Sequence, residues 1–164
     1  MVGPLLVGCA IAHSVETAVF KFLAVFKSLL LASVLATSLS AQAQTPPAIK
    51  VVYHLSEGIP QASRAIANIR NHLAADPTAK IVVVTHGAGI DFLLDGANNT
   101  ANQSFAGAIG DLSAKGVGFF VCNNTLVSRN IDAAKVAMEA KVVPSGVAEV
   151  ARLQAREGYV YLRP

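Results

Sequence analysis

The chain has 164 residues and a net charge of +3; 53% of its residues are hydrophobic and only 14% are charged. This length fits a single domain, and the small charge argues against a protein that binds nucleic acid or an anionic membrane surface. The hydrophobic residues are most concentrated near the N-terminus, where the pattern differs from that of the rest of the chain.

The segment that ends at Ala43 has the pattern of a secretory signal peptide. Lys21 and Lys27 precede an apolar run at residues 28–39, and Ala41-Gln42-Ala43 supplies the small residues of a cleavage site. A retained membrane anchor would need ~20 apolar residues, and the run here is shorter and rich in Ser and Thr. We therefore expect cleavage after Ala43, a periplasmic location and no stable membrane anchor.

Residues 1–18 do not fit a signal peptide, because Pro4, His13 and Glu16 lie upstream of the charges that should open it. The hypothesis that explains them is an assigned start that lies too early, with Val19 or Val25 as the true initiator.

Cleavage after Ala43 would leave one domain, residues 44–164. It would carry eleven basic and nine acidic residues, and hence a net charge of +2 (11 − 9). Cleavage would also remove Cys9, so that Cys122 would be the single cysteine of an exported protein. We expect no internal disulfide bond, and a Cys122 thiol that is free, modified or bonded to another molecule.

Strands and helices are predicted to alternate after residue 49. Short β-branched runs predict the strands, and apolar residues spaced three or four apart predict the helices. The continuous apolar run at Lys80–Thr85 is typical of a strand buried on both faces, as in a parallel sheet. The expected strands are Lys50–Leu55, Lys80–Thr85, Gly116–Val121, Ala140–Val143 and Tyr159–Leu162. The expected helices are Gln61–Ala75, Phe105–Lys115, one that follows Cys122 and continues to Ala134, and Val147–Arg156. This alternation predicts an α/β fold, a mostly parallel sheet of about five strands with helices on both faces.

A glycine-rich turn, His86-Gly87-Ala88-Gly89, follows the second expected strand. Its glycines are expected to permit a tight turn with positive φ. The pair Gly87-x-Gly89 lacks the third glycine and the acidic residue of a dinucleotide fingerprint, so a nucleotide or flavin site is poorly supported. Asp91, just after the turn, is expected to cap a helix. The polar segment Asp95–Phe105 is expected to form a loop over the site.

Cys122 lies where the third expected strand turns into a helix. The polar segment Asn123–Thr125 predicts a first helical turn in which these side chains accept hydrogen bonds from free N–H groups. A thiol there feels the positive end of the helix dipole, and Arg129 lies two turns along on roughly the same face. Both effects favour the reactive thiolate. A lone cysteine is otherwise a buried small hydrophobe, but strand ends of this kind are where parallel sheets place their ligands.

From about Ile49 to Pro164 the sequence resembles the DsrE/DsrF-like family of small α/β sulfur-relay proteins. The resemblance rests on the VVYHL strand, the THGAGIDFLL segment at residues 85–94, the segment Cys122–Ile131 with arginine seven residues after the cysteine, and the sequence from Val142 to the C-terminus. It implies a flavodoxin-like sheet and assembly into trimers or hexamers. It also implies that Cys122 occupies the position at which active members accept a persulfide sulfur. The relay proteins of the family work in the cytoplasm, whereas this chain resembles an exported branch.

The leading hypothesis is a sulfur carrier. The C-terminal ends of parallel strands meet at one edge of a sheet, and this edge would gather residues from several loops around Cys122. Cys122 would attack a donor persulfide, Arg129 and the helix N-terminus would stabilise the anion, and a histidine would pass protons. The sulfur donor and acceptor would be other proteins, and no cofactor is expected. The predicted binding residues are His54, His86, Gly87, Asn123, Ser145 and Gly146.

The alternative is a non-catalytic, oligomeric module that binds a small ligand or a metal ion. Two histidines and a thiolate suit a soft or borderline metal, but ligands from separate loops are a weak signal, and we assign no metal site. A neutral, hydrogen-bonded histidine at a strand end is the commoner outcome for His54 and His86. His72 is expected at the surface. The low charge suits a homo-oligomer in which apolar helix faces bury each other.

Overall fold

The computed structural model describes residues 47–164. The predicted signal peptide and the predicted late start of translation lie outside the described residues. Within residues 47–164, no helix combines the length and the apolar character that crossing a membrane would require.

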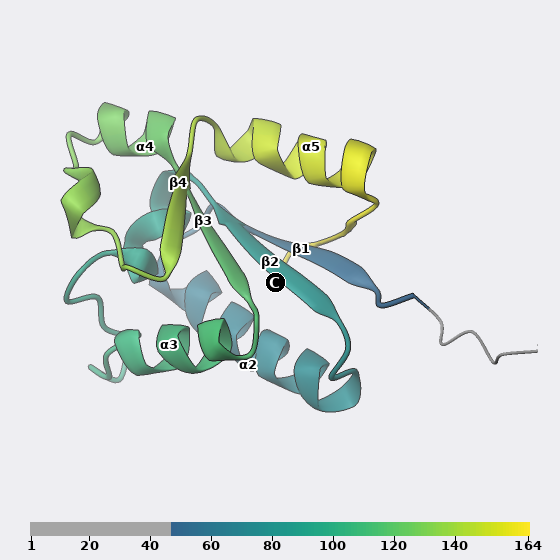
Figure 1. Cartoon of the computed structure of the whole chain (residues 1–164). Coiled ribbons are helices and arrows are strands. Elements are labelled where there is room, and N and C mark those ends of the chain that lie inside the picture. The colour runs from purple at the N-terminus through teal and green to yellow at the C-terminus, as the bar shows by residue number, and fades with distance from the viewer. Residues whose placement is uncertain (1–46) are drawn as a thin grey trace, which may run out of the picture. The chain divides into compact units, whose positions relative to one another are not determined.

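The described chain forms one five-stranded sheet whose strands all run parallel, with the spatial order β4-β3-β2-β1-β5. Figure 1 shows β4, β3, β2 and β1 in this order. The predicted α/β fold with a mostly parallel sheet of about five strands is therefore confirmed. The strands are β1 (Lys50–Leu55), β2 (Lys80–Thr85), β3 (Gly118–Cys122), β4 (Ala140–Val143) and β5 (Val160–Leu162).

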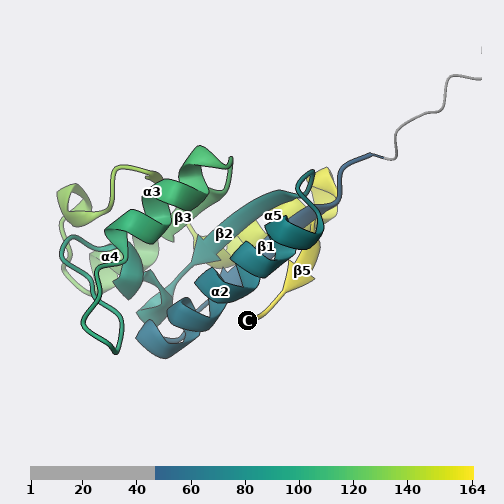
Figure 2. The same ribbon diagram turned by 90° about the horizontal axis from the view of Figure 1, so that it is seen from below.

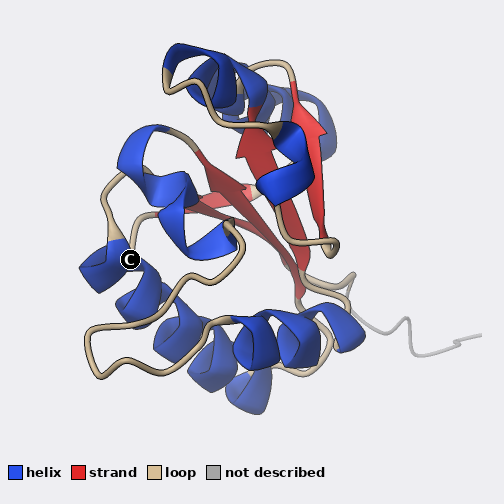
Figure 3. Ribbon diagram, turned by 90° about the vertical axis from the view of Figure 1, so that its left-hand side faces the viewer, coloured by secondary structure: helices blue, strands red, loops and turns tan. Residues whose placement is uncertain are grey.

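Helices cover both faces of the sheet. The helices α2 (Ile59–Ala75) and α3 (Ala106–Ala114) lie on one face together with the short 3-10 helix Gly87–Leu93, and α5 (Gly146–Glu157) lies on the other. Figures 2 and 3 show the sheet between these two layers. A period of two assigns the strand residues to the faces: Val83 packs under α2 and α3, and Val82 and Val84 pack under α5.

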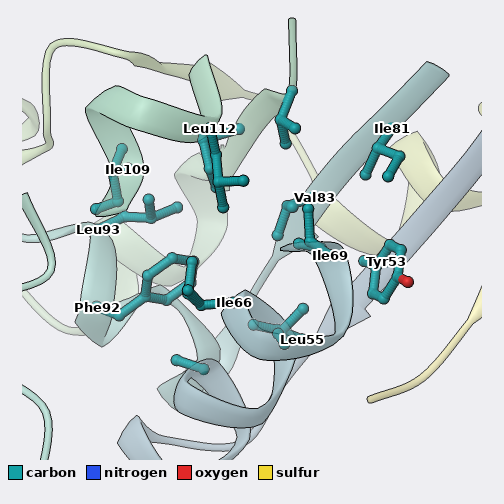
Figure 4. Packing of buried hydrophobic residues seen from close by; sticks show 14 of the residues in the cluster. Tyr53, Leu55, Ile66, Ile69, Ile81, Val83, Phe92, Leu93, Ile109 and Leu112 are labelled. Carbon is teal, nitrogen blue, oxygen red and sulfur yellow. The ribbon is translucent and has the colours of Figure 1, made fainter. Parts of the chain in front are cut away.

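The larger core lies between the sheet and the α2–α3 layer. Its apolar side chains come from strands, from α2, from α3 and from the 3-10 helix, as Figure 4 shows for Leu55, Ile69, Phe92 and Leu112. The core under α5 is smaller, because a single helix covers that face. It consists of Val52, Val82, Val84, Val150 and Leu153, with Phe120 and Tyr159 packed against it.

Helix α2 begins at Ile59, two residues before the predicted start. Pro60 lies in its first turn, where a missing N–H costs nothing because the first N–H groups of a helix have no partner within it. The predicted helix began after this proline, and the structure shows that the proline opens the helix.

The helix after the cysteine, α4 (Asn123–Ser128), ends much earlier than predicted. Asn130 takes a left-handed conformation with φ of 51°. The N–H of Asn130 donates to Val127 O at 3.1 Å, and the N–H of Ile131 donates to Leu126 O at 2.9 Å. This is a Schellman motif, which closes a helix. The predicted continuation to Ala134 is wrong, and the apolar side chain of Val127 in α4 is 71% exposed. A further 3-10 turn covers Ala133–Lys135.

Candidate functional site at the carboxyl edge of the sheet

Four polar side chains gather on the α5 face of the sheet, at the carboxyl ends of its strands. His54 and His86 lie two residues beyond Val52 and Val84, which are buried under α5, so the strand period directs them to the same face. The same period places Cys122 two residues beyond Phe120. Strand register determines which of these residues lie side by side. Thr85 pairs with Val121, so the residues that follow them, His86 and Cys122, are neighbours at the ends of β2 and β3. Tyr161 of β5 pairs with Val52 of β1.

Cys122 lies where the connections of neighbouring strands diverge. After β3 the chain enters α4, whose Leu126 packs into the core on the α2–α3 face. After β4 it enters α5 on the opposite face. In open parallel sheets such a divergence leaves a crevice at the strand ends where ligands bind. The position of Cys122 is therefore the place where this fold would be expected to do chemistry.

The Cys122 thiol is 5% exposed and occupies the N-cap position of α4. It makes no side-chain cap hydrogen bond. The Thr125 hydroxyl accepts from the Gly87 N–H and not from an N–H group of α4, contrary to the sequence prediction. Burial raises the pKa of the thiol. The N–H group of Gly146, the Thr125 hydroxyl and N–H, and the Asn124 N–H lower it by more, so the pKa lies below its usual value. These groups favour the thiolate, as the sequence predicts, but they are N–H and hydroxyl donors and not the Arg129 guanidinium.

Gly146 is the first residue of α5 and lies between Cys122 and His86. A Cβ atom on Gly146 would lie 2.9 Å from Thr85 O and 3.2 Å from the Cβ atoms of both Cys122 and His86. Only glycine lets the start of α5 approach so closely, and this approach brings the Gly146 N–H to the thiol. The preceding Ser145 caps α5, its Oγ accepting a hydrogen bond from the Ala148 N–H at 3.4 Å.

The rings of His54 and His86 lie next to each other, tilted by 33°, with their centroids 4.8 Å apart. The Nδ1 atom of His54 shares a hydrogen bond of 2.8 Å with the Tyr161 hydroxyl, and its Nε2 atom is buried without a partner among the described residues. Burial lowers the pKa of His54, and the charges of His86 and Arg163 lower it further. The imidazole of His54 is thus neutral at pH 7, and its hydrogen bond at a strand end is the outcome that the sequence predicted for it.

Arg129 binds the glycine turn that follows β2. Its Nη1 atom donates to the Asp91 carboxylate at 2.6 Å and to Gly87 O at 3.2 Å. Asp91 was expected to cap a helix; instead it forms this ion pair. Gly87 has a φ of 56°, as predicted for the turn, and its N–H donates to the Thr125 hydroxyl at 3.0 Å. The two predicted site residues Arg129 and Gly87 therefore bind each other through a hydrogen bond.

The other predicted residues have simpler surroundings. Asn123 is exposed in the first turn of α4. His72 is half-buried and shares a hydrogen bond of 3.0 Å with the Tyr53 hydroxyl, so its expected place at the open surface is wrong. The loop at residues 95–105 places Asn99 and Gln103 over a groove of about 430 Å³ between α2 and α3 and not over Cys122.

Sequence reasoning did not assign Thr125, Asp91 or Tyr161 to the site. For Thr125 a signal was available, because it lies three residues after the N-cap Cys122, the spacing at which capping side chains meet the backbone. Asp91 and Tyr161 reach the site only through contacts between segments distant in the sequence. Within residues 47–164, no three His, Cys, Asp or Glu side chains lie close enough together to hold a metal ion. His54, His86 and Cys122 therefore do not form the metal-binding group considered from the sequence.

Comparison with known proteins places the chain within a described family. The model of the DsrE/DsrF-like family matches residues 33–164. The solved structure of MTH1491, a protein of unknown function from Methanobacterium thermoautotrophicum, is 31% identical with a TM-score of 0.63, and the match covers 71% of this chain and 99% of that one. The ychN protein from E. coli shares the fold, with 12% identity and a TM-score of 0.57 over 71% of this chain and 98% of its own. No curated protein matches the chain.

Proposed function

The chain belongs to the DsrE/DsrF-like family, and from this membership we propose that it is a sulfur carrier that holds a persulfide on Cys122. The observation that carries the proposal is the set of hydrogen-bond donors around the thiol. The N–H groups of Gly146, Asn124 and Thr125, with the Thr125 hydroxyl, lower the pKa of Cys122 although the thiol is buried. A cysteine that served only as a small hydrophobe would need no such donors.

The proposed reaction is the transfer of a sulfane sulfur between thiols. The Cys122 thiolate attacks the outer sulfur of a donor persulfide, R–S–SH. A bond forms between Cys122 Sγ and that sulfur, the S–S bond of the donor breaks, and its electron pair leaves on the inner sulfur of the donor as the thiolate R–S⁻. The sulfur then leaves Cys122 in the same way, when an acceptor thiolate attacks it. No external oxidant or reductant is needed, because the oxidation states of the two partners exchange.

The residues of the edge supply what this reaction requires. The donors around Cys122 stabilise negative charge on sulfur before and after transfer. His86 lies across Gly146 from Cys122 and is the nearest candidate for accepting the proton of the thiol. In this proposal Arg129 does not contact the sulfur but fixes the glycine turn beside it, since its guanidinium binds Gly87 and Asp91.

Sulfur loading followed by intact mass tests the proposal. The chain would be incubated with an alkyl persulfide, freed of excess reagent and weighed, and a gain of about 32 Da per sulfur is expected. Subsequent release of that mass to a small thiol would show that the sulfur is held in transferable form. A chain that gains no mass would favour the alternative, a non-catalytic module that binds a small ligand.

We propose further that the chain is exported and processed. The pattern before residue 44 supports this, with two lysines, an apolar run and small residues before the cleavage site. When the whole gene is expressed in a bacterium, the periplasmic form is expected to begin at Gln44, as measured by N-terminal sequencing and mass. Recovery of the uncleaved chain from the cytoplasm would contradict both the location and the cleavage.

We also propose that the protein is a homo-oligomer. The support lies at the edges of the sheet, where strand β5 exposes the apolar side chains Val160 and Leu162 and strand β4 exposes Val142. Exposed apolar edge strands favour association. Light scattering is expected to give the mass of a trimer or hexamer, and Val160→Lys to lower it, whereas Ala114→Lys at the end of α3 should not. A monomer at micromolar concentration would contradict this proposal.

A further inference from the structure

The Thr125 hydroxyl is buried between the cysteine and the glycine turn. The Thr125 residue is 8% exposed, and its Oγ1 atom accepts a hydrogen bond from the Gly87 N–H at 3.0 Å. Gly87 follows β2 and Thr125 follows β3, so this bond joins two neighbouring loops of the carboxyl edge. Thr125 lies three residues after Cys122, within the first turn of α4.

The bond from Gly87 determines the direction of the hydroxyl proton. A threonine hydroxyl has one donor and two acceptor positions. Because the backbone N–H of Gly87 can only donate, the oxygen must accept from it, and the hydroxyl proton remains for another partner. Cys122 occupies the N-cap position three residues before Thr125, and the Thr125 side chain is one of the groups that lower the pKa of Cys122. The bond from Gly87 therefore leaves the hydroxyl proton available for the Cys122 sulfur.

The turn that orients the hydroxyl is itself held by α4. Arg129, which ends α4, donates to Gly87 O at 3.2 Å and to the Asp91 carboxylate at 2.6 Å. Both backbone polar groups of Gly87 are thus bound by side chains of one short segment: the N–H by Thr125 and the carbonyl by Arg129. This arrangement leaves the Gly87 N–H little freedom to turn away from Thr125.

We propose that Thr125 is a positioning residue for the sulfur chemistry of Cys122, and that the Gly87 N–H fixes its hydroxyl so that the proton is directed at the sulfur anion. Its donation to the thiolate is inferred from the Gly87 bond and from the place of Thr125 in the helical turn that begins at Cys122. Its donation to a bound persulfide rests on the proposed function. In this scheme Arg129 acts on Cys122 through Gly87 and Thr125.

The test compares three variants in the full chain carrying Cys9→Ser, so that Cys122 is the only thiol. Thr125→Val keeps the shape and removes the hydroxyl, and Thr125→Ser restores it. Thr85→Val is the matched control, because Thr85 is also buried but its hydroxyl donates to Phe120 O and not to sulfur. The readout is the pKa of Cys122, taken from the ultraviolet absorbance of its thiolate as the pH is raised.

Thr125→Val is expected to raise the pKa of Cys122 by roughly one unit, and Thr125→Ser to return it towards that of the unaltered chain. Thr85→Val is expected to lower stability while leaving the pKa of Cys122 in place. An unchanged pKa in Thr125→Val, with the fold retained, would overturn the proposal. So would an equal shift in Thr85→Val, which would indicate a general loosening of the edge. If Thr125→Val unfolds, Gly87→Ala, which displaces the orienting N–H, decides instead: a pKa of Cys122 equal to that of the unaltered chain would overturn the proposal.

These outcomes are separate from those of the proposed function. The titration needs no sulfur donor, so a chain that takes up no sulfur leaves the comparison of pKa values intact. Conversely, the rate of sulfur loading can be compared at a pH well below the thiol pKa. Equal rates for Thr125→Val and the unaltered chain would contradict the role of Thr125 while supporting the carrier.

Discussion

Replacement of Cys122 by serine is expected to abolish sulfur loading. The unaltered chain should gain about 32 Da per sulfur from a persulfide donor. Cys122→Ser should gain nothing, because a serine hydroxyl does not attack a persulfide as a thiolate does. Serine is only slightly smaller than cysteine and is a preferred N-cap residue, so α4 and the fold are expected to persist. Intact mass measures the loading, and circular dichroism confirms the fold.

Two comparisons make this result specific to Cys122. The chain contains one other cysteine, Cys9, and Cys9→Ser should load sulfur like the unaltered chain. A mass gain that persists in Cys122→Ser but disappears in Cys9→Ser would place the chemistry on the N-terminal segment and contradict the proposed carrier. Failure of both single variants to change the loading would point to sulfur held outside the thiols.

Replacement of Gly89 by alanine is expected to destabilise the whole domain by about 3 kcal/mol or more. A Cβ atom on Gly89 would lie 2.3 Å from Leu55 O and 2.5 Å from Leu55 C, both backbone atoms at the end of β1. Backbone atoms of a central strand cannot move aside as the end of a flexible side chain can. The glycine turn would have to retreat from the sheet, and the buried Ile90 and Phe92 would leave their places in the core.

Urea denaturation measures this effect, with Gly107→Ala as the matched control. Gly107 lies in α3, where an added Cβ meets no atom within 4 Å, so alanine there should be neutral or stabilise the chain by up to about 1 kcal/mol. Equal stability of Gly89→Ala and the unaltered chain would mean that the turn does not pack against β1 as described. The position was expected to need a positive φ, but close approach to the strand is what requires glycine there.

The sequence predicted the elements of this fold well because their signals are local. A continuous β-branched run such as Lys80–Thr85 is a buried strand wherever it lies in the sheet, and it spans β2 as predicted. The end of α4 was missed for a reason that is also local. The apolar residues continue past Ser128, but Asn130 adopts the left-handed conformation that closes the helix, and asparagine is a usual residue at that position.

The candidate site was predicted in part. The strand period and the parallel sheet were enough to bring His54, His86 and Cys122 to one edge, because the face of each residue follows from its position in its own strand. The hydrogen-bond and ion-pair partners of the site residues could not be predicted from the sequence. Nothing near Arg129 in the sequence indicates that its guanidinium binds Asp91, and nothing near His54 indicates the Tyr161 hydroxyl.

The sequence by itself thus determined the order and type of the elements, the parallel sheet, the family and the position of Cys122 at the end of β3. Tertiary structure alone decided what surrounds the sulfur: the Gly146 N–H brought from the start of α5, and the Thr125 hydroxyl bound by the Gly87 N–H. The reason is physical. Periodicity and strand-end position are properties of neighbouring residues, whereas a hydrogen bond between loops depends on the register of the strands and on backbone conformations that are fixed only when the chain packs.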